Sequence, residues 1–213
     1  MIEVKNLTKN YNPDFSALLN LSFVVDKKPL AVIGYNYAGK TTLLNILAGL
    51  DNNYSGDVII NGVNRRDLKN EENIISYIMD PVVLFENKSV YDNLKYVYKV
   101  SGEADKEKIN KEIKAVAEEL HLFGVLTKKV RKCNYFEKLL VCVGRILIKK
   151  PKIIMVDEPL KNLLNFEKRS LLQTLVSVAS KLSSDLIVAE YGQNLAYFND
   201  FEILKLDFGT KVE

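Results

Sequence analysis

This sequence contains few cysteines and histidines, and neither positive nor negative charge is in large excess. The two cysteines, Cys133 and Cys142, are spaced as in no zinc or redox motif, so we expect reduced, ordinary thiols. The only histidine, His121, is interpreted as structural. Lysine and arginine number 30 against 27 aspartates and glutamates, a net charge of +3. Proteins that bind duplex nucleic acid usually concentrate far more positive charge, so nucleic acid is not an expected partner.

Long apolar runs are missing as well. No run approaches the roughly 18 residues that a membrane-spanning helix needs. The first residues, MIEVKNLTKNY, alternate apolar and polar side chains and lack the apolar core of a signal peptide. We therefore expect a cytoplasmic chain that reaches a membrane only through a partner. The 213 residues are 47% hydrophobic, which suits one large α/β domain with a full core.

Periodic patterns predict strands that alternate with helices. Alternating residues from Leu19 to Val25 predict a half-buried strand with Leu19, Leu21, Phe23 and Val25 on its apolar face. The wholly apolar run Leu30–Ile33, followed by Gly34, is typical of a buried parallel strand. A helix is expected from Lys40 to Leu50 and a helical stretch from about 90 to 150. Further strands are predicted at Val58–Asn61, Ile74–Ile78, Ile153–Asp157, Asp185–Glu190 and Phe201–Leu206. Such alternation implies a mostly parallel sheet flanked by helices.

One segment carries a specific chemical signature. The stretch Gly34–Thr41 reads GYNYAGKT and matches G-x-x-x-x-G-K-[ST] in full, between an apolar strand and a helix. A loop of this kind turns successive backbone N–H groups toward phosphate oxygens at the positive end of the helix dipole. Lys40 would place a cation on the β- and γ-phosphates, and Thr41 would offer a hydroxyl to Mg²⁺. The predicted nucleotide-binding residues here are Gly34, Tyr35, Asn36, Tyr37, Ala38, Gly39, Lys40, Thr41 and Thr42.

An acidic pair follows a later apolar strand. The run IIMVDE ends in Asp157 and Glu158, and Pro159 comes next. An apolar strand that ends in aspartate is where P-loop enzymes hold Mg²⁺, so Asp157 is predicted to be a metal ligand. Glu158 can reach an attacking water as a general base.

Together these segments resemble the nucleotide-binding domain of ABC transporters over nearly the whole chain. The resemblance rests on IEVKNLTKNY, LLNLSFVVD, GYNYAGKTTLLNILAGL, SGDVIINGVNRRD, VYDNL and GRILIKKPKIIMVDEP. It implies an α/β P-loop NTPase in one domain, 1–213. Residues 1–80 and 150–213 would form the core with an antiparallel β subdomain, and about 85–145 a helical subdomain.

The resemblance also implies ligands and partners. Tyr11 would stack on the adenine of ATP, and two identical or different cassettes would form a dimer that sandwiches each nucleotide between them. A membrane-spanning subunit would dock in the groove near Asp80–Glu86. The stretch from Phe85 to Tyr98 would face this subunit or, alternatively, pack between the lobes of the domain. The chain would then lie on the inner face of the cell membrane.

Several positions depart from the family pattern. Asp80 stands where the family has a glutamine and can still touch Mg²⁺ or water, so it is a candidate metal ligand and catalytic residue. Glu190 occupies the position of the switch histidine and is a second catalytic candidate, beside Glu158. The glycine-rich signature is replaced by Cys133–Glu137, in which Tyr135 and Phe136 are expected to block a partner's phosphate and Glu137 to repel it. Leu164 replaces an aspartate, and Tyr35 and Tyr37 replace small residues.

Because of these departures, the sequence does not decide between several functions. Hydrolysis is expected to be slow or absent, because positioning and charge stabilisation supply nearly all of the catalysis in phosphoryl transfer. The favoured hypothesis is a transporter ATP-binding subunit. A soluble ABC ATPase without a transport role, a catalytically inactive regulatory ATP-binding protein, and a P-loop kinase or GTPase are the alternatives.

Overall fold

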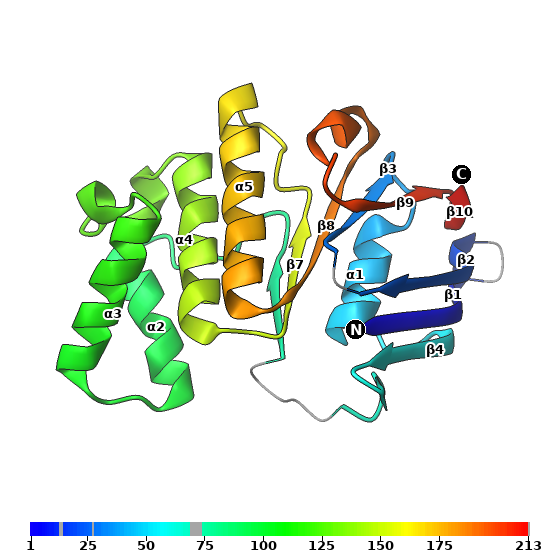
Figure 1. Cartoon of the computed structure of the whole chain (residues 1–213), viewed down its shortest axis with the longest axis horizontal. Helices are drawn as coiled ribbons and strands as arrows, with labels where there is room; N and C mark the ends of the chain where they lie inside the picture. The colour runs from blue at the N-terminus through cyan, green and yellow to red at the C-terminus, as the bar shows by residue number, and fades with distance from the viewer. Residues whose placement is uncertain (13–14, 27, 69–73, 213) are drawn as a thin grey trace.

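The structure is a computed structural model, and it describes residues 1–12, 15–26, 28–68 and 74–212. Within these residues the larger of two sheets has six strands in the order β10-β9-β3-β8-β7-β6 (Figure 1). These strands span Thr210–Val212, Glu202–Asp207, Leu30–Gly34, Asp185–Tyr191, Ile153–Asp157 and Ile75–Ile78, in the same order. All of the neighbouring pairs are parallel except the β9–β10 hairpin. The carboxyl ends of β3, β7 and β8 therefore meet at one edge of the sheet, where ligands of such sheets bind.

The smaller sheet is antiparallel. Its order is β2-β1-β4-β5, and its strands span Phe15–Val25, Ile2–Asn12, Ser55–Ile60 and Val63–Asn64. Helix α1 (Lys40–Ala48) lies between the two sheets (Figure 1). Four of its side chains are fully buried on more than one side of the helix, namely Leu43, Leu44, Ile46 and Leu47. One apolar core thus joins both sheets around α1.

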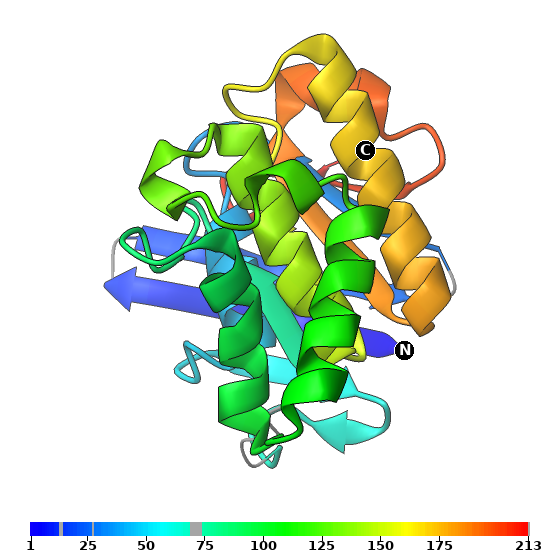
Figure 2. The same ribbon diagram turned by 90° about the vertical axis from the view of Figure 1, so that its left-hand side faces the viewer.

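The other face of the parallel sheet is covered by helices. In β7, Ile153 and Met155 face α1, whereas Ile154 and Val156 belong to the second core on the helical side. This alternation is the period-two pattern of a strand that is buried on both faces. Figure 2 shows the helices in front of the sheet. They are α2 (Val90–Ser101), α3 (Lys106–Glu119), α4 (Tyr135–Lys149) and α5 (Asn165–Leu182). The described residues also contain short 3₁₀ segments at Phe123–Val125, Val130–Lys132 and Gly192–Tyr197.

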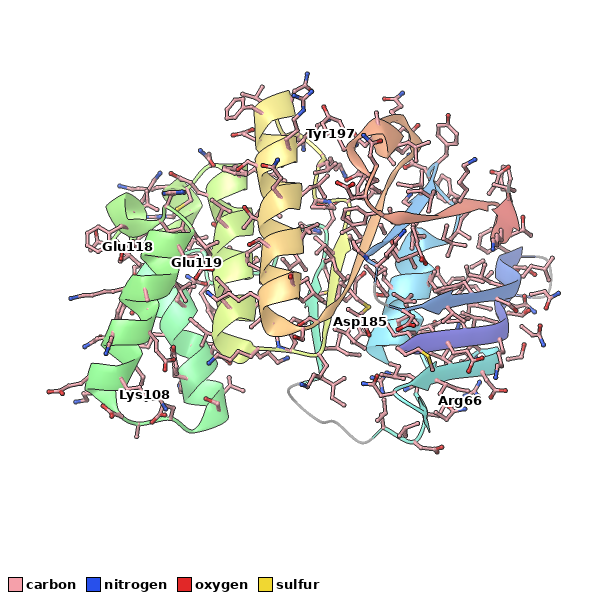
Figure 3. The ribbon with its side chains drawn as sticks, viewed as in Figure 1. Arg66, Lys108, Glu118, Glu119, Asp185 and Tyr197 are labelled. Atoms are coloured by element: carbon pink, nitrogen blue, oxygen red, sulfur yellow. The ribbon has the colours of Figure 1, made fainter. Side chains whose placement is uncertain are left out.

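Close packing and one ion pair join these helices. A β-carbon added to Gly144 of α4 would lie 2.7 Å from the Leu94 side chain of α2, so α2 and α4 meet where a side chain is missing. Glu119 at the end of α3 accepts from Lys181 of α5 at 2.9 Å (Figure 3). The pair is solvent-exposed, so its contribution to stability is small. The helical side is held mainly by its apolar core.

The predicted fold class is confirmed: a mostly parallel sheet flanked by helices, with an antiparallel sheet beside it. One detail was wrong. Leu19 is 50% exposed, and Leu18 is buried in its place. Asn20 has a φ of +49°, and β2 gains one residue relative to β1 between Leu21 and Leu18, which is the geometry of a bulge. The bulge moves Leu19 to the solvent face. The division into 1–80, 85–145 and 150–213 stays a prediction.

Candidate nucleotide-binding site

The loop between β3 and α1 is shaped by two left-handed residues. Gly39 has a φ of +96°, and a β-carbon there would lie 2.4 Å from the carbonyl oxygen of Ala17. Tyr37 has a φ of +66° and is 84% exposed, a conformation that glycine adopts with less strain. The side chain of Tyr35 leaves the loop and packs edge-to-face on Tyr191 with ring centroids 5.2 Å apart. In the described chain no side chain caps the start of α1, so its first N–H groups are available to an anion.

A cavity of about 440 Å³ opens over this loop, a volume within the usual range for small-ligand sites. Tyr11 and Phe15 at the ends of β1 and β2 contribute to its wall, and Tyr11 is 56% exposed. The Lys9 ammonium lies 4.8 Å from the centre of the Tyr11 ring. The other lining residues are Ala17, Asn36, Tyr37, Ala38, Gly39, Lys40, Thr41, Thr42 and Glu158.

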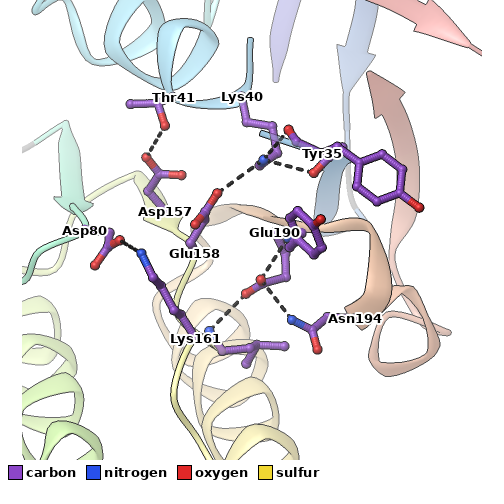
Figure 4. A network of polar contacts seen from close by, with 12 residues as sticks. Tyr35, Lys40, Thr41, Asp80, Asp157, Glu158, Lys161, Glu190 and Asn194 are labelled. Carbon is purple, nitrogen blue, oxygen red and sulfur yellow. Dashed lines mark hydrogen bonds and ion pairs between the residues drawn. The ribbon is translucent and has the colours of Figure 1, made fainter. Parts of the chain in front are cut away.

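Lys40 is the buried cation of this cavity. Its side chain is 4% exposed. The ammonium donates to the carbonyl oxygens of Gly34 at 2.9 Å and Tyr35 at 3.0 Å and lies 3.2 Å from Glu158 Oε1 (Figure 4). The ammonium thus has two backbone acceptors and one carboxylate as its neighbours.

Asp157 ends β7 beside the loop. Its Oδ2 accepts from the Thr41 hydroxyl at 2.7 Å and from the Tyr77 hydroxyl at 3.3 Å. Its Oδ1 is buried and has no hydrogen-bond partner among the described residues. Burial raises the pKa of Asp157, and the hydrogen bond from Thr41 opposes this. An unpartnered buried carboxylate oxygen is costly unless something else satisfies it.

These donors fit Mg²⁺. The described residues contain no group of three or more His, Cys, Asp or Glu side chains that could hold a metal on their own. Magnesium in nucleotide sites takes one or two protein oxygens and completes its shell with phosphate oxygens and water. The free Oδ1 of Asp157 and the hydroxyl of Thr41 provide such a pair.

Glu158 stands at the start of the segment that follows β7. Its φ is +44°, so the chain turns sharply at this residue, and its backbone N–H donates to the carbonyl of Ala189 at 2.8 Å. The side chain is 22% exposed in the cavity, where it pairs with Lys40. This position suits a general base for a water that approaches the phosphates, although here the carboxylate is held by the lysine.

The two other catalytic candidates are held by the protein. Asp80 pairs with Lys161 at 2.9 Å. Glu190 is 1% exposed; its Oε2 accepts from the N–H of Leu160 at 2.9 Å, and its Oε1 accepts from the N–H of Tyr191 at 2.8 Å and from Asn194 at 3.0 Å (Figure 4). Their roles in catalysis, and that of Asp80 as a metal ligand, stay predictions.

The segment Cys133–Glu137, predicted to stand in place of the signature motif, forms the start of α4. Asn134 caps the helix by accepting from the N–H of Glu137 at 2.7 Å, and Glu137 accepts from the N–H of Asn134 at 2.9 Å. Lys128 adds an ion pair to Glu137 at 2.9 Å. Tyr135 and Phe136 are half-buried and pack against the helical core, and their role as an obstacle to a partner's phosphate stays a prediction. The negative charge of Glu137 is already neutralised within the chain.

Comparison with known proteins identifies the family. Residues 18–161 match the family model described as ABC transporter. The chain belongs to the ABC transporter family. It is 30% identical to the molybdate/tungstate import ATP-binding protein WtpC of Methanocaldococcus jannaschii, in an alignment that covers 99% of this chain and 71% of that protein. Against the sn-glycerol-3-phosphate import ATP-binding protein UgpC of Yersinia enterocolitica the identity is 29%, over 76% of this chain but only 45% of the relative.

Solved ABC cassettes share the fold. The ATP-binding cassette MJ0796, solved as a dimer bound to ADP and Pi, superposes with a TM-score of 0.85 at 20% identity, covering 100% of this chain and 97% of that one. The cbiO1 protein of Clostridium perfringens, part of the transporter complex cbiONQ, gives the same TM-score at 20% identity, with 100% and 86% covered. The P-loop NTPase fold is therefore confirmed for this ABC family member.

The structure brings most of the predicted site residues to one place. Eight of the predicted binding residues line the cavity together with Glu158: Tyr11, Asn36, Tyr37, Ala38, Gly39, Lys40, Thr41 and Thr42. Gly34 and Tyr35 instead accept from Lys40 through their carbonyls. Sequence reasoning missed Tyr77 and Lys161. Neither lies in a motif, and their contacts depend on β6 and the segment after β7 being neighbours in space.

Proposed function

We propose that this chain is the ATP-binding subunit of an ABC transporter and that it couples nucleotide binding to a membrane-spanning partner. The observation that carries the proposal is the cavity over Gly39–Thr41, where a buried lysine meets an uncapped helix start. Asp157, with its unpartnered carboxylate oxygen, is hydrogen-bonded to Thr41 of the cavity wall. The names of the relatives, which are import ATP-binding proteins, support the same function. The transported substrate is not part of the proposal.

The residues divide the chemistry as follows. Lys40 binds the β- and γ-phosphates, the loop N–H groups and the start of α1 bind the remaining phosphate oxygens, and Tyr11 stacks on the base. Thr41 and Asp157 would hold Mg²⁺, which when bound neutralises charge on the phosphates. Glu158, released from Lys40, orients and deprotonates the attacking water.

A second candidate, a catalytically inactive regulatory ATP-binding protein, is favoured by one observation. Lys40, Asp80 and Glu190 are each engaged with other groups of the protein. Binding must rearrange such contacts before any group can act on the nucleotide. Hydrolysis would then be slow or absent even where binding is tight.

The partners follow from two surfaces. We propose a sandwich dimer, with an identical or a different cassette, across the phosphate-loop face. We propose a membrane-spanning partner in a groove of about 530 Å³ between the edge strand β6 and helices α2 and α4, lined among others by Val83, Tyr96, Val100 and Arg145. No helix in the described part of the chain is long and apolar enough to cross a membrane. Such a partner would hold the chain at the inner face of the cell membrane.

Single-turnover hydrolysis of labelled ATP tests the nucleotide function, with Lys40→Ala and Glu158→Gln beside the parent chain. Magnesium-dependent phosphate release that is lost in both variants establishes an ATPase. ATP binding that falls in Lys40→Ala without phosphate release establishes the inactive binder. The absence of ATP binding in the parent chain refutes both. For the membrane partner, Tyr96→Asp is expected to abolish co-sedimentation with membranes while ATP binding is kept.

A further inference from the structure

The segment between β7 and α5, residues 158–164, is fastened to the end of β8 at two points. The N–H of Glu158 donates to the carbonyl of Ala189 at 2.8 Å. Two residues later the N–H of Leu160, whose side chain is fully buried, donates to the carboxylate of Glu190 at 2.9 Å. We call this segment the β7–α5 loop. Its start is therefore held by one backbone bond and by one side chain from the neighbouring strand.

Glu190 is built into this arrangement as a buried acceptor. Three N–H donors converge on its two oxygens, from Leu160, Tyr191 and Asn194. Asn194 in turn accepts from Lys168 of α5 at 3.0 Å. Hydrogen bonds to a charged acceptor are about twice as strong as neutral ones. The carboxylate therefore joins the end of β8, the 3₁₀ segment after it and the β7–α5 loop.

The held loop presents Glu158 to the phosphate loop. Lys40 has three N–H donors, and two of them go to backbone carbonyls. The ammonium also forms an ion pair with Glu158 Oε1 at 3.2 Å; Glu158 is the only charged partner that the described structure gives Lys40, and its carboxylate repels a phosphate. A nucleotide phosphate that approaches the Lys40 ammonium therefore competes with the carboxylate of Glu158 for the same positive charge. Glu158 is the group that phosphate displaces most easily.

We propose that Glu190 is a positioning residue that clamps the β7–α5 loop at Leu160 and so holds Glu158 against Lys40 as a latch that ATP must open. The inference rests on the proposed function only in its second half, because the clamp itself needs no nucleotide. It differs from a direct catalytic role for Glu190, in which the carboxylate would act on the bound nucleotide.

The clamp is tested by amide hydrogen exchange on the nucleotide-free chain with Glu190→Gln. A glutamine has one acceptor oxygen where the carboxylate has two, and its NH₂ group would face a backbone donor. The amide of Leu160 or of Tyr191 is expected to exchange about tenfold faster. Glu167→Gln is the matched control: Glu167 accepts from Leu164 at the other end of the same loop, so only the Leu164 amide should change. Unchanged exchange at both Leu160 and Tyr191 overturns the proposal.

The latch is tested by ATP titration without Mg²⁺ in a double-variant cycle of Glu158→Gln and Glu190→Gln. Each single variant is expected to bind ATP about two- to fivefold more tightly, the range set by one partly exposed ion pair. The double variant should bind no more tightly than Glu158→Gln alone, because Glu190 acts through Glu158. Additive effects, or weaker binding in Glu190→Gln, overturn the latch. A parent chain that binds no ATP refutes the proposed function and leaves the exchange result to decide the clamp.

Discussion

The substitution Asp157→Asn separates the metal role of this residue from its role in folding. The asparagine oxygen can still accept from Thr41, so the link between α1 and β7 is kept. Its NH₂ group would lie where Oδ1 is now buried without a partner, which costs about 1–3 kcal/mol. Removing a carboxylate whose charge is disfavoured by burial offsets much of that cost. The net change in the free energy of unfolding is expected to stay within about 1 kcal/mol, or roughly 2–4 °C in the thermal midpoint.

The effect on magnesium should be much larger. A charge-assisted contact contributes about 1.5–3 kcal/mol, so the enhancement of ATP affinity by Mg²⁺ should fall about ten- to hundredfold in Asp157→Asn. Calorimetric ATP titrations in MgCl₂ and in EDTA measure this ratio. Asp185→Asn is the control, because Asp185 lies at the other end of the neighbouring strand and pairs with the N-terminus at 3.1 Å (Figure 3). Equal enhancement in Asp157→Asn and the parent chain would show that the free oxygen does not face a metal.

Three further predictions concern the supports of the site. Gly39→Ala should abolish ATP binding in titrations. Gly62→Ala is the control, because φ is +83° there but no described atom lies within 4 Å of the added carbon, and it should lose only about 1 kcal/mol of stability. Loss of binding in both variants would refute the steric explanation. Glu137→Gln should lose about 0.3–1 kcal/mol in denaturant unfolding at pH 7, the range for a charge near a helix start with a partly exposed ion pair. Burial raises the Glu137 pKa, but the Lys128 and backbone hydrogen bonds hold it below its ordinary 4.5. The difference should therefore vanish as the pH falls through that lowered pKa. Arg145→Lys should lose about 1–3 kcal/mol in thermal unfolding, because the guanidinium bridges Asn93 and the carbonyl of Val83; an unchanged midpoint would contradict this.

The sequence predicts those site residues whose positions depend on neighbouring residues in the chain. A phosphate loop is defined by backbone turns over eight residues, so Lys40 and Thr41 can be placed from spacing alone. Asp157 follows from the rule that parallel strands end at one edge. The contacts of Glu190 could not be predicted in the same way. They depend on β8 lying beside β7 and on which backbone N–H groups of the β7–α5 loop approach the end of β8, and both are set by the order of strands in the sheet.

A similar limit applies to the fold. The strand at Ile153–Asp157 was predicted to the residue, since a run of apolar residues buried on both faces leaves no choice of register. In the half-buried strand β2 the predicted face failed at Leu19, because one inserted residue reverses every side chain beyond it. The bulge has no strong sequence signal: Asn20 is one of several asparagines in polar positions, and only its φ of +49° reveals it.

The residues proposed to act on this chain's own nucleotide and the segment predicted to face a partner's nucleotide lie in different parts of the structure. Lys40, Asp157 and Glu158 line or adjoin one cavity, whereas the start of α4 is closed by Asn134 and Glu137 with Lys128. The resemblance to ABC cassettes implies that this helix start faces the other subunit's γ-phosphate. In a dimer of identical chains, both sites would meet the closed helix, and neither would hydrolyse ATP quickly. With a different partner that carries an intact signature, the site built on this chain's Lys40 would meet that signature, although Asp80 and Glu190 still depart from the family pattern on this chain's side. Mixing this chain with such a partner should therefore restore turnover that Lys40→Ala in this chain removes, and Lys40→Ala without effect would place the active site on the partner.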